Sequence, residues 1–232
     1  MAADCVLCSR RLLLRDGIPM AMFWTVAGDH DSWAGWAAAM AQAAPSPLVE
    51  SLLAARSAAT GGWALDVGCG TGRAFAPLAK LGFQIVGVDP TRPALSASRT
   101  RATAERLPAW PVGATAERLP LRAASIDFVV AIGILFHLGP GELAGALREI
   151  RRVLRPGGEG IGQFLDVEDW RRALGRRVPE EQVPNRQALV TCFCSADDVR
   201  EQLAAAGLQV RSLDMHIHSD ERGERREWVV TY

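Results

Sequence analysis

The sequence predicts an α/β protein with a Rossmann-like, doubly wound sheet that is mostly parallel, with a C-terminal antiparallel hairpin strand and an N-terminal helical cap. Short apolar runs alternate with segments whose apolar residues recur at helical spacing, which is typical of strands and helices in turn. A glycine-rich turn joins the first such run to its helix, as in nucleotide-binding folds. Two apolar runs separated by a polar turn end the chain, which favours an edge hairpin.

Composition bounds the answer. The 232 residues suffice for one α/β domain with a sizeable core and a small cap. Lys+Arg and Asp+Glu are both 26, so the zero net charge gives no nucleic-acid footprint. No apolar run reaches membrane-spanning length. Five cysteines in such a chain favour free thiols over a disulfide framework, and we expect a cytoplasmic protein.

The expected organisation has three parts. Residues 1–20 are expected to form a loosely ordered leader, and residues 21–58 a helical cap or lid interrupted by prolines at 45 and 47. Residues 59–232 form the Rossmann-like domain, with an insertion at about 166–188. Because connecting loops carry function on rigid scaffolds, this insertion is the candidate for substrate specificity.

The first strand, Trp63–Val67, leads into glycines at 68, 70 and 72, and residues 73–81 then have helical spacing. Glycine supplies the positive φ of so sharp a turn and lets a ligand approach where no Cβ stands. The spacing differs from the dinucleotide fingerprint G-x-G-x-x-G. Asp66 precedes the first glycine by two residues, where its carboxylate suits an amine better than a phosphate. The pattern therefore favours a ligand with a cationic amino-acid end.

The second strand covers residues 83–89 and ends at Asp89, 23 residues after Asp66. An acidic residue at about this distance beyond a glycine loop accepts hydrogen bonds from ribose hydroxyls. The alternative role, an N-cap for the helix that begins at Pro90, is compatible with it.

The next elements follow the same alternation. Residues 109–112 form a short strand, between two copies of Thr-Ala-Glu-Arg-Leu-Pro at 103–108 and 115–120. The second copy is expected to be a functional loop. Residues 126–133 form an almost continuously apolar central strand, which suits the middle of a parallel sheet. A helix over 142–154, closed by Pro-Gly-Gly, precedes a strand over 160–165.

The C-terminal part begins with an apolar run over 189–193. Ser195 and Asp198 then form a capping-box variant that opens a helix ending at Gly207. Residues 208–217 and 227–232 are expected as antiparallel strands joined by a polar turn over 219–226.

Taken together, these segments resemble the class I S-adenosylmethionine-dependent methyltransferases of the small methyltransferase-domain type. The resemblance runs from about residue 63 to 158, with weaker support to 232. The segments that carry it are Leu-Asp-Val-Gly-Cys-Gly-Thr-Gly at 65–72, Val-Gly-Val-Asp at 86–89, Ala-Glu-Arg-Leu-Pro at 116–120, Ile-Asp-Phe-Val-Val at 126–130 and Arg-Val-Leu-Arg-Pro-Gly-Gly at 152–158.

The resemblance implies S-adenosylmethionine as the cofactor and assigns its contacts. The methionine end would face Asp66 and the glycine loop, the ribose diol Asp89, and the adenine the loop around Ala116, while residues 132–137 would lie below the sulfonium. The expected cofactor-binding residues are Asp66, Gly68, Cys69, Gly70, Gly72, Asp89, Pro90, Thr115, Ala116, Glu117 and Ile132. One departure is Thr115, where the family usually has an aspartate that pairs with the adenine amine.

Methyl transfer from a sulfonium requires a nucleophile in line with the methyl carbon, and a general base only if the acceptor keeps its proton. His137 is the candidate base or substrate contact; the alternative is a histidine that caps the strand-to-helix turn. An aromatic lid over the ligand, able to hold a cation, is the second expectation, the alternative being a helix packed on the sheet. The candidate lid residues are Trp24, His30, Trp33 and Trp36.

No metal site is expected. His216 and His218 share one face of a predicted strand, and the pattern favours a surface pair at the sheet edge. Cys5 and Cys8 have zinc-knuckle spacing, but Cys192 and Cys194 do not have the spacing of the usual second half of a four-thiolate zinc site, so unpaired cysteines are favoured. Cys69 is expected to be a packed thiol.

The sequence therefore predicts in-line methyl transfer to a small-molecule acceptor. The alternatives are a non-catalytic module that binds S-adenosylmethionine or S-adenosylhomocysteine and acts through a partner, or a methyltransferase acting on tRNA or protein. A nicotinamide-dependent reductase is disfavoured, because the third glycine is misplaced and the sole tyrosine, Tyr232, forms no Tyr-x-x-x-Lys pair. The methylated atom and the oligomeric state are left open.

Overall fold

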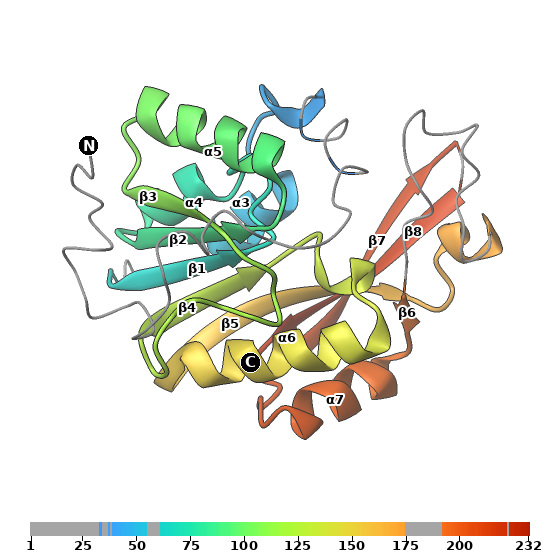
Figure 1. The fold of residues 1–232 in the computed structure, drawn as a ribbon. Coiled ribbons are helices and arrows are strands. Elements are labelled where there is room, and N and C mark those ends of the chain that lie inside the picture. Colours follow the sequence, from blue (N-terminus) through green and yellow to red (C-terminus); the bar gives the residue numbers. More distant parts are fainter. Residues whose placement is uncertain (1–32, 34–36, 38, 55–60, 175–191, 222) are drawn as a thin grey trace.

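The structure is a computed structural model that describes residues 33, 37, 39–54, 61–174, 192–221 and 223–232. Its centre is one sheet with the order β3-β2-β1-β4-β5-β8-β7, and a short strand, β6, also pairs with β5 (Figure 1). The described part of the chain thus has the predicted α/β architecture. Leader residues 1–20 and most of the expected cap lie outside the described residues.

The parallel half of the sheet contains the predicted central strands. β1 (Trp63–Val67) pairs with β2 (Gln84–Asp89) and β4 (Ile126–Ala131), and β3 (Ala109–Gly113) pairs with β2. Each strand is buried nearly throughout because helices cover both faces, which explains the near-continuous apolar runs. Asp66 and Asp89 both lie at the carboxyl ends of neighbouring strands, as predicted.

Two helical layers sandwich the sheet (Figure 1). One contains α3 (Pro47–Ala54), α4 (Phe75–Lys80) and α5 (Arg92–Ala104), and the other contains α6 (Pro140–Val153) and α7 (Ala196–Ala205). Alternate residues of β1 serve the two cores: Leu65 and Val67 pack on the α6 side, whereas Ala64 packs on the α4 side. Asp66 shares the face of Ala64, so its carboxyl lies under the first layer.

The capping box predicted for α7 is confirmed. Ser195 Oγ accepts from the Asp198 backbone N–H at 3.2 Å, and Asp198 accepts from the Ser195 backbone N–H at 2.8 Å. Gly207, at φ +74°, follows the end of the helix, the position where a glycine is favoured.

Two predicted boundaries are wrong. β5 (Leu154–Asp166) begins at the end of α6, so the Pro-Gly-Gly segment at 156–158 lies in its irregular first part; the pairing with β4 shifts register between Ile126 and Phe128. The polar segment 219–226 is mostly strand: β7 (Ser212–Asp220) and β8 (Gly223–Thr231) pair up to Asp220 and Gly223. Cross-strand pairing favours a longer hairpin than polarity alone indicates.

The expected insertion at 166–188 is described only in part. A short 3-10 helix, η4 (Trp170–Leu174), follows β5, and the residues from 175 to 191 lie outside the described part. β6 (Phe193–Cys194) then pairs with the end of β5, which places Phe193 and Cys194 at the sheet.

Candidate functional site

A cavity of about 390 Å³ opens at the carboxyl ends of β1 and β4, under the start of α3. The glycine loop contributes Asp66, Gly68 and Cys69, and the end of β4 contributes Ile132 and Gly133. Its opposite wall comes from β5 and the C-terminal hairpin. A site at this edge of a mostly parallel sheet is where α/β folds bind ligands.

Asp66 is the most unusual group in the cavity, because it is only 5% exposed. No described residue hydrogen-bonds its carboxyl. Burial, and then the nearby charge of Asp89, raise the pKa of Asp66 to about 8. A buried carboxyl in this state is stabilised as a carboxylate by a cation, such as the ammonium group of an amino-acid ligand.

The glycine loop takes its shape from backbone conformation and close packing. Gly68 and Gly72 have φ of +67° and +78°. A Cβ on Gly68 would lie 2.8 Å from Ile134, and one on Gly72 would lie 2.7 Å from Phe75. The Cys69 N–H donates to the Val88 carbonyl at 3.0 Å, which ties the loop to β2. Only glycine fits these two positions without a backbone shift.

Asp89 joins the two strand ends. Its Oδ2 accepts from the Gly70 N–H at 3.0 Å, and its Oδ1 accepts from the Thr91 N–H at 2.7 Å. The N-cap of α5 is Thr91, so Asp89 orders the residues before the helix. Asp89 thus lies at the end of the second strand beside the glycine loop, where an acidic residue of α/β nucleotide-binding folds accepts from ribose hydroxyls.

The predicted adenine loop follows β3 directly. Thr115 is half-buried and Ala116 is buried, and a Cβ on Gly145 of α6 would lie 2.9 Å from the Cβ of Glu117. Close packing against α6 therefore fixes the backbone at Glu117. Pro90, after Asp89, is half-buried.

His137 ends a 3-10 turn, η3 (Leu135–His137), beyond β4. Its ring lies 4.4 Å from that of Phe136 and 4.8 Å from that of Trp33, the latter edge-on. Of the described residues, Phe136 lines the cavity, whereas His137 is not among its lining. His137 therefore does not line the cavity itself, but its ring packs on a residue that does.

Trp33 is the one candidate lid residue within the described part of the chain, since Trp24, His30 and Trp36 lie outside it. Hydrogen bonds hold the segment after it, residues 40–44, near the glycine loop. Thr71 donates to the Met40 carbonyl at 3.1 Å, and Arg73 donates to the Ala44 carbonyl at 2.9 Å.

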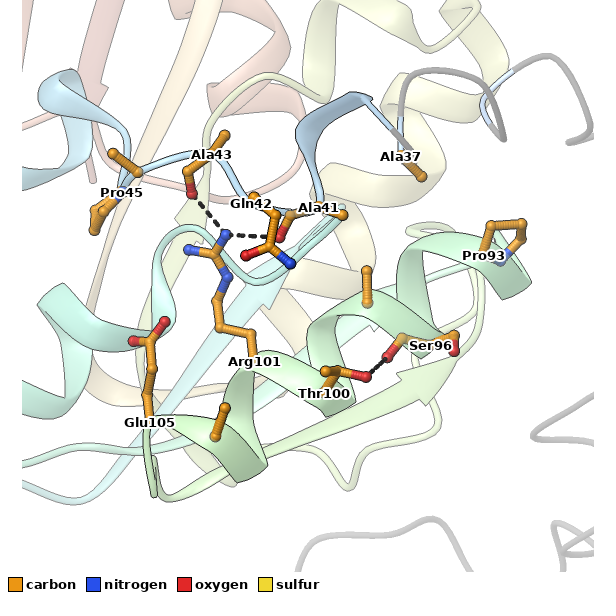
Figure 2. Close-up of a pocket in the computed structure, with 13 residues that line it drawn as sticks. Ala37, Ala41, Gln42, Ala43, Pro45, Pro93, Ser96, Thr100, Arg101 and Glu105 are labelled. Atoms are coloured by element: carbon orange, nitrogen blue, oxygen red, sulfur yellow. Dashed lines mark hydrogen bonds between the residues drawn. The ribbon is translucent and has the colours of Figure 1, made fainter.

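Figure 2 shows a third side chain that holds this segment, Arg101, beside a separate cavity of about 610 Å³ on α5. Arg101 donates to the carbonyls of Ala41 and Ala43, at 3.2 and 2.6 Å. The hydrogen bonds from Thr71, Arg73 and Arg101 place the start of α3 over the glycine loop. As a result, Pro47, Leu48 and Val49 line the first cavity.

The sequence missed four residues of the opposite wall, namely Gln163, His218, Arg225 and Glu227. Gln163 is the lone polar side chain in the apolar run 160–165, which is a signal that could have indicated it. Its Oε1 accepts from the Gly133 N–H at 2.9 Å, and its Nε2 donates to Glu227 at 2.7 Å. His218 was expected as a surface residue at the sheet edge; it is exposed but also lines the cavity, because the hairpin is longer than predicted.

Glu227 belongs to a buried charge network behind this wall. Arg171 of η4 donates to Glu227 at 3.2 Å and makes a two-pronged pair with Asp169, with both distances 2.7 Å. Burial alone would raise the pKa of Asp169, but the hydrogen bonds from Arg171 and the Arg226 backbone outweigh it, and the net pKa is lowered. The network gives Glu227 a cationic partner, Arg171.

The cysteines are packed. Cys69 is buried, and burial followed by the charges of Asp89 and Asp66 raises the pKa of its thiol well above the usual range. Cys192 Sγ lies 3.2 Å from the Leu138 carbonyl, and Cys194 is buried against Gln202. Within the described ranges, no group of three or more His, Cys, Asp or Glu residues could hold a metal. Cys5 and Cys8 lie outside the described residues.

The sheet order and the cavity beside the glycine loop define a Rossmann-like cofactor-binding domain. The model of the family described as "Methyltransferase domain" matches residues 65–161. An uncharacterised protein of Mycobacterium tuberculosis is 32% identical over 204 residues, covering 82% of this chain and 73% of that protein. An uncharacterised methyltransferase of Mycobacterium bovis is 34% identical over 127 residues, covering 53% and 49%.

Solved structures share the fold. An S-adenosylmethionine-dependent methyltransferase of Methanosarcina mazei has a TM-score of 0.64 at 18% identity, covering 81% of this chain and 97% of that one. A 1,6-didemethyltoxoflavin N1-methyltransferase of Burkholderia thailandensis with bound S-adenosylhomocysteine has 0.62 at 19%, covering 89% and 90%. The [4+2]-cyclase SpnF has 0.62 at 22%, covering 79% and 78%.

The chain therefore belongs to the methyltransferase-domain family, the class I S-adenosylmethionine-dependent methyltransferases, and S-adenosylmethionine is its cofactor. The described residues fit that cofactor: Asp66 is a buried carboxyl that a cation would stabilise as a carboxylate, and Gly68 and Cys69 of the glycine loop line the cavity beside it. None of the described helices is long and apolar enough to span a membrane.

Proposed function

We propose that this protein transfers the methyl group of S-adenosylmethionine to a small-molecule acceptor. The observation that supports this proposal is the cavity of about 390 Å³, which is lined by Asp66 and the glycine loop on one side and by polar hairpin residues on the other. Small-molecule pockets begin at about 300 Å³, and this volume must also hold the methionine end of the cofactor. The remaining space suits a small acceptor better than a folded polymer. A cytoplasmic location is part of the same proposal.

The cofactor contacts follow from the charges of the wall. Asp66 would accept from the ammonium group, and Arg73, which lines the same cavity and donates only Nε to Ala44, would offer its remaining N–H groups to the carboxylate. Asp89 would accept from the ribose hydroxyls. Thr115, Ala116 and Glu117 would border the adenine, with the Thr115 hydroxyl in place of the family's carboxylate.

The cofactor supplies a methyl group on a sulfonium, which is already electrophilic, so the protein's residues orient the reactants and exclude water. Such positioning can lower the barrier by roughly 7–11 kcal/mol. For a hydroxyl acceptor a general base is needed as well. His137 is the proposed proton acceptor, because its ring packs on Phe136, which lines the cavity.

Calorimetry tests the cofactor site. S-adenosylmethionine and S-adenosylhomocysteine should bind the wild type at micromolar concentration. Asp89→Asn, which keeps one oxygen for the loop, should weaken both by more than tenfold, about 1.4 kcal/mol. Transfer of labelled methyl to a mixed pool of small acceptors then tests the reaction. Folded wild type that binds neither ligand would contradict the proposal.

A second candidate is a module that binds the cofactor without transferring methyl. It is favoured by the likeness to the [4+2]-cyclase SpnF, since the same fold there carries a different activity. Binding of both ligands with no label transfer to any small acceptor, tRNA or protein pool would support this candidate over methyl transfer.

A further inference from the structure

The C-terminal hairpin extends beyond the rest of the sheet. The ladder between β5 and β8 ends at Glu227, whereas β7 and β8 continue to pair up to Asp220 and Gly223. Figure 1 shows the two strands projecting past the sheet as a separate arm. Within this arm His218 lies opposite Arg225, and residues opposite each other in an antiparallel pair share one face. Both residues line the cavity, so this face of the arm lies on the same cavity as the glycine loop.

The two charged side chains on this face, Glu227 and Arg225, differ in how closely they are paired. Glu227 has a side chain only 12% exposed, and it accepts from Arg171 at 3.2 Å and from Gln163 at 2.7 Å. Arg225 approaches Glu227 only to 4.0 Å, and its side chain is 44% exposed. Since Arg171 already forms an ion pair with Glu227, Arg225 keeps most of its five N–H donors for a ligand. No described residue hydrogen-bonds the side chain of His218, which adds a further N–H donor beside it.

Apolar side chains line the cavity as well. Leu48 and Val49 of α3, Ile132 after β4, and Phe136 of η3 line the same cavity. Phe136 is buried and presents a ring to it. A cavity that combines these apolar side chains with the donors of Arg225 and His218 suits an amphipathic molecule with an oxyanion at one end.

We propose that Arg225 and His218 bind an oxyanionic group, a carboxylate or a phosphate, on a small acceptor whose apolar body packs on Phe136 and Ile132. This inference rests on the proposed methyl transfer and adds the class of acceptor to it. Arg225 and His218 are specificity-determining residues: they fix the acceptor by its anion, so that its nucleophilic atom reaches the methyl group.

Binding of simple probes tests the inference. Benzoate and phenyl phosphate are titrated, each beside the neutral analogue benzamide, into protein saturated with S-adenosylhomocysteine at constant ionic strength, with ligand-observed NMR as readout. Both anions should bind at least tenfold more tightly than benzamide, and Arg225→Gln and His218→Gln should each remove most of that preference. Arg200→Gln, which deletes an exposed arginine of α7 that is paired with Asp197, is the matched control and should keep it.

The arms separate the possible failures. If S-adenosylhomocysteine fails to bind, the proposed function itself falls, whatever the probes do. If it binds, equal affinity for benzamide and the anions, or no binding of either anion, overturns the inference and leaves the proposed function standing. A loss of S-adenosylhomocysteine affinity in Arg225→Gln would assign that arginine to the cofactor and overturn the inference too. A preference for phenyl phosphate over benzoate, or the reverse, identifies which oxyanion the acceptor carries.

Discussion

At the scale of single residues, Asp66 links folding to binding. Its burial favours the neutral carboxyl, so the pKa lies at about 8 in the absence of ligand. A pKa raised above its unfolded value contributes stability that is present below about pH 4 and is lost as the pH rises through about 8. A bound ammonium group reverses this preference, since it stabilises the carboxylate.

Proton release should therefore accompany cofactor binding. At pH 6.5 the free protein holds a proton on Asp66 and the complex does not, so binding of S-adenosylhomocysteine should release close to one proton. Calorimetry in buffers of different ionisation enthalpy measures this number. Asp66→Asn should show no such release at the same pH. Binding by the wild type at pH 6.5 without proton release would contradict the role given to Asp66.

Gly68 provides the second prediction at this scale. Gly68→Ala puts a side chain at φ +67° and a Cβ 2.8 Å from Ile134. The left-handed backbone alone costs about 1–2 kcal/mol, and the contact adds to it. We expect a loss of about 2–4 kcal/mol in the free energy of unfolding, measured with urea. Gly133→Ala is the control, because Gly133 has φ +78° but nothing within 4 Å of its Cβ position. Equal losses in the two variants would show that Ile134 relaxes at little energetic cost.

At the scale of elements, α7 holds the second helical layer against β5 and β6. Val199 and Leu203 are its fully buried side chains, and Ser195 and Asp198 satisfy its first backbone N–H groups. The helix has only ten residues, so its start depends on this cap and on tertiary packing more than on intrinsic propensity.

Ser195→Ala removes one half of the box. It should lower the free energy of unfolding by about 1 kcal/mol, with a similar slope in urea, since the helix stays packed. Asp197→Ala is the control: its ion pair with Arg200 is exposed, and such pairs contribute little. If both variants lose the same amount, surface charge rather than the cap stabilises this helix end.

At the scale of the whole molecule, the cavity joins parts that are far apart in the chain. The start of α3, the glycine loop after β1, the end of β4, and the hairpin all line it. A ligand that bridges these parts binds the folded protein and not the unfolded chain, so it shifts the folding equilibrium by mass action.

Thermal unfolding measures that shift. At 100 times its Kd, S-adenosylhomocysteine should stabilise the protein by about 2.7 kcal/mol and raise Tm by about 5–10 °C. Asp89→Asn should show a much smaller shift at the same concentration. NADH is the comparison ligand and should produce none. A shift with NADH and none with S-adenosylhomocysteine would favour the reductase that the glycine spacing disfavours.

Local sequence patterns predict the parallel core and the glycine-loop wall of the cavity. Burial on both faces forces continuous apolar strands, and a sharp turn beside a ligand forces glycines, so β1, β2, β4 and the positions of Asp66 and Asp89 are visible as local patterns. The capping box of α7 is visible for the same reason, since its contacts span three residues.

The wall opposite the glycine loop depends on contacts that form only in the folded chain. The hairpin length depends on cross-strand pairing, which polarity in residues 219–226 concealed, and that length brings His218 and Arg225 to the cavity. Gln163 and Glu227 meet across 64 positions of sequence. The rings of His137 and Phe136 pack against each other, and this packing, which chain position does not reveal, decides that Phe136 lines the cavity. Contacts between distant segments leave no period or spacing in the chain, and so sequence patterns do not reveal this wall of the cavity.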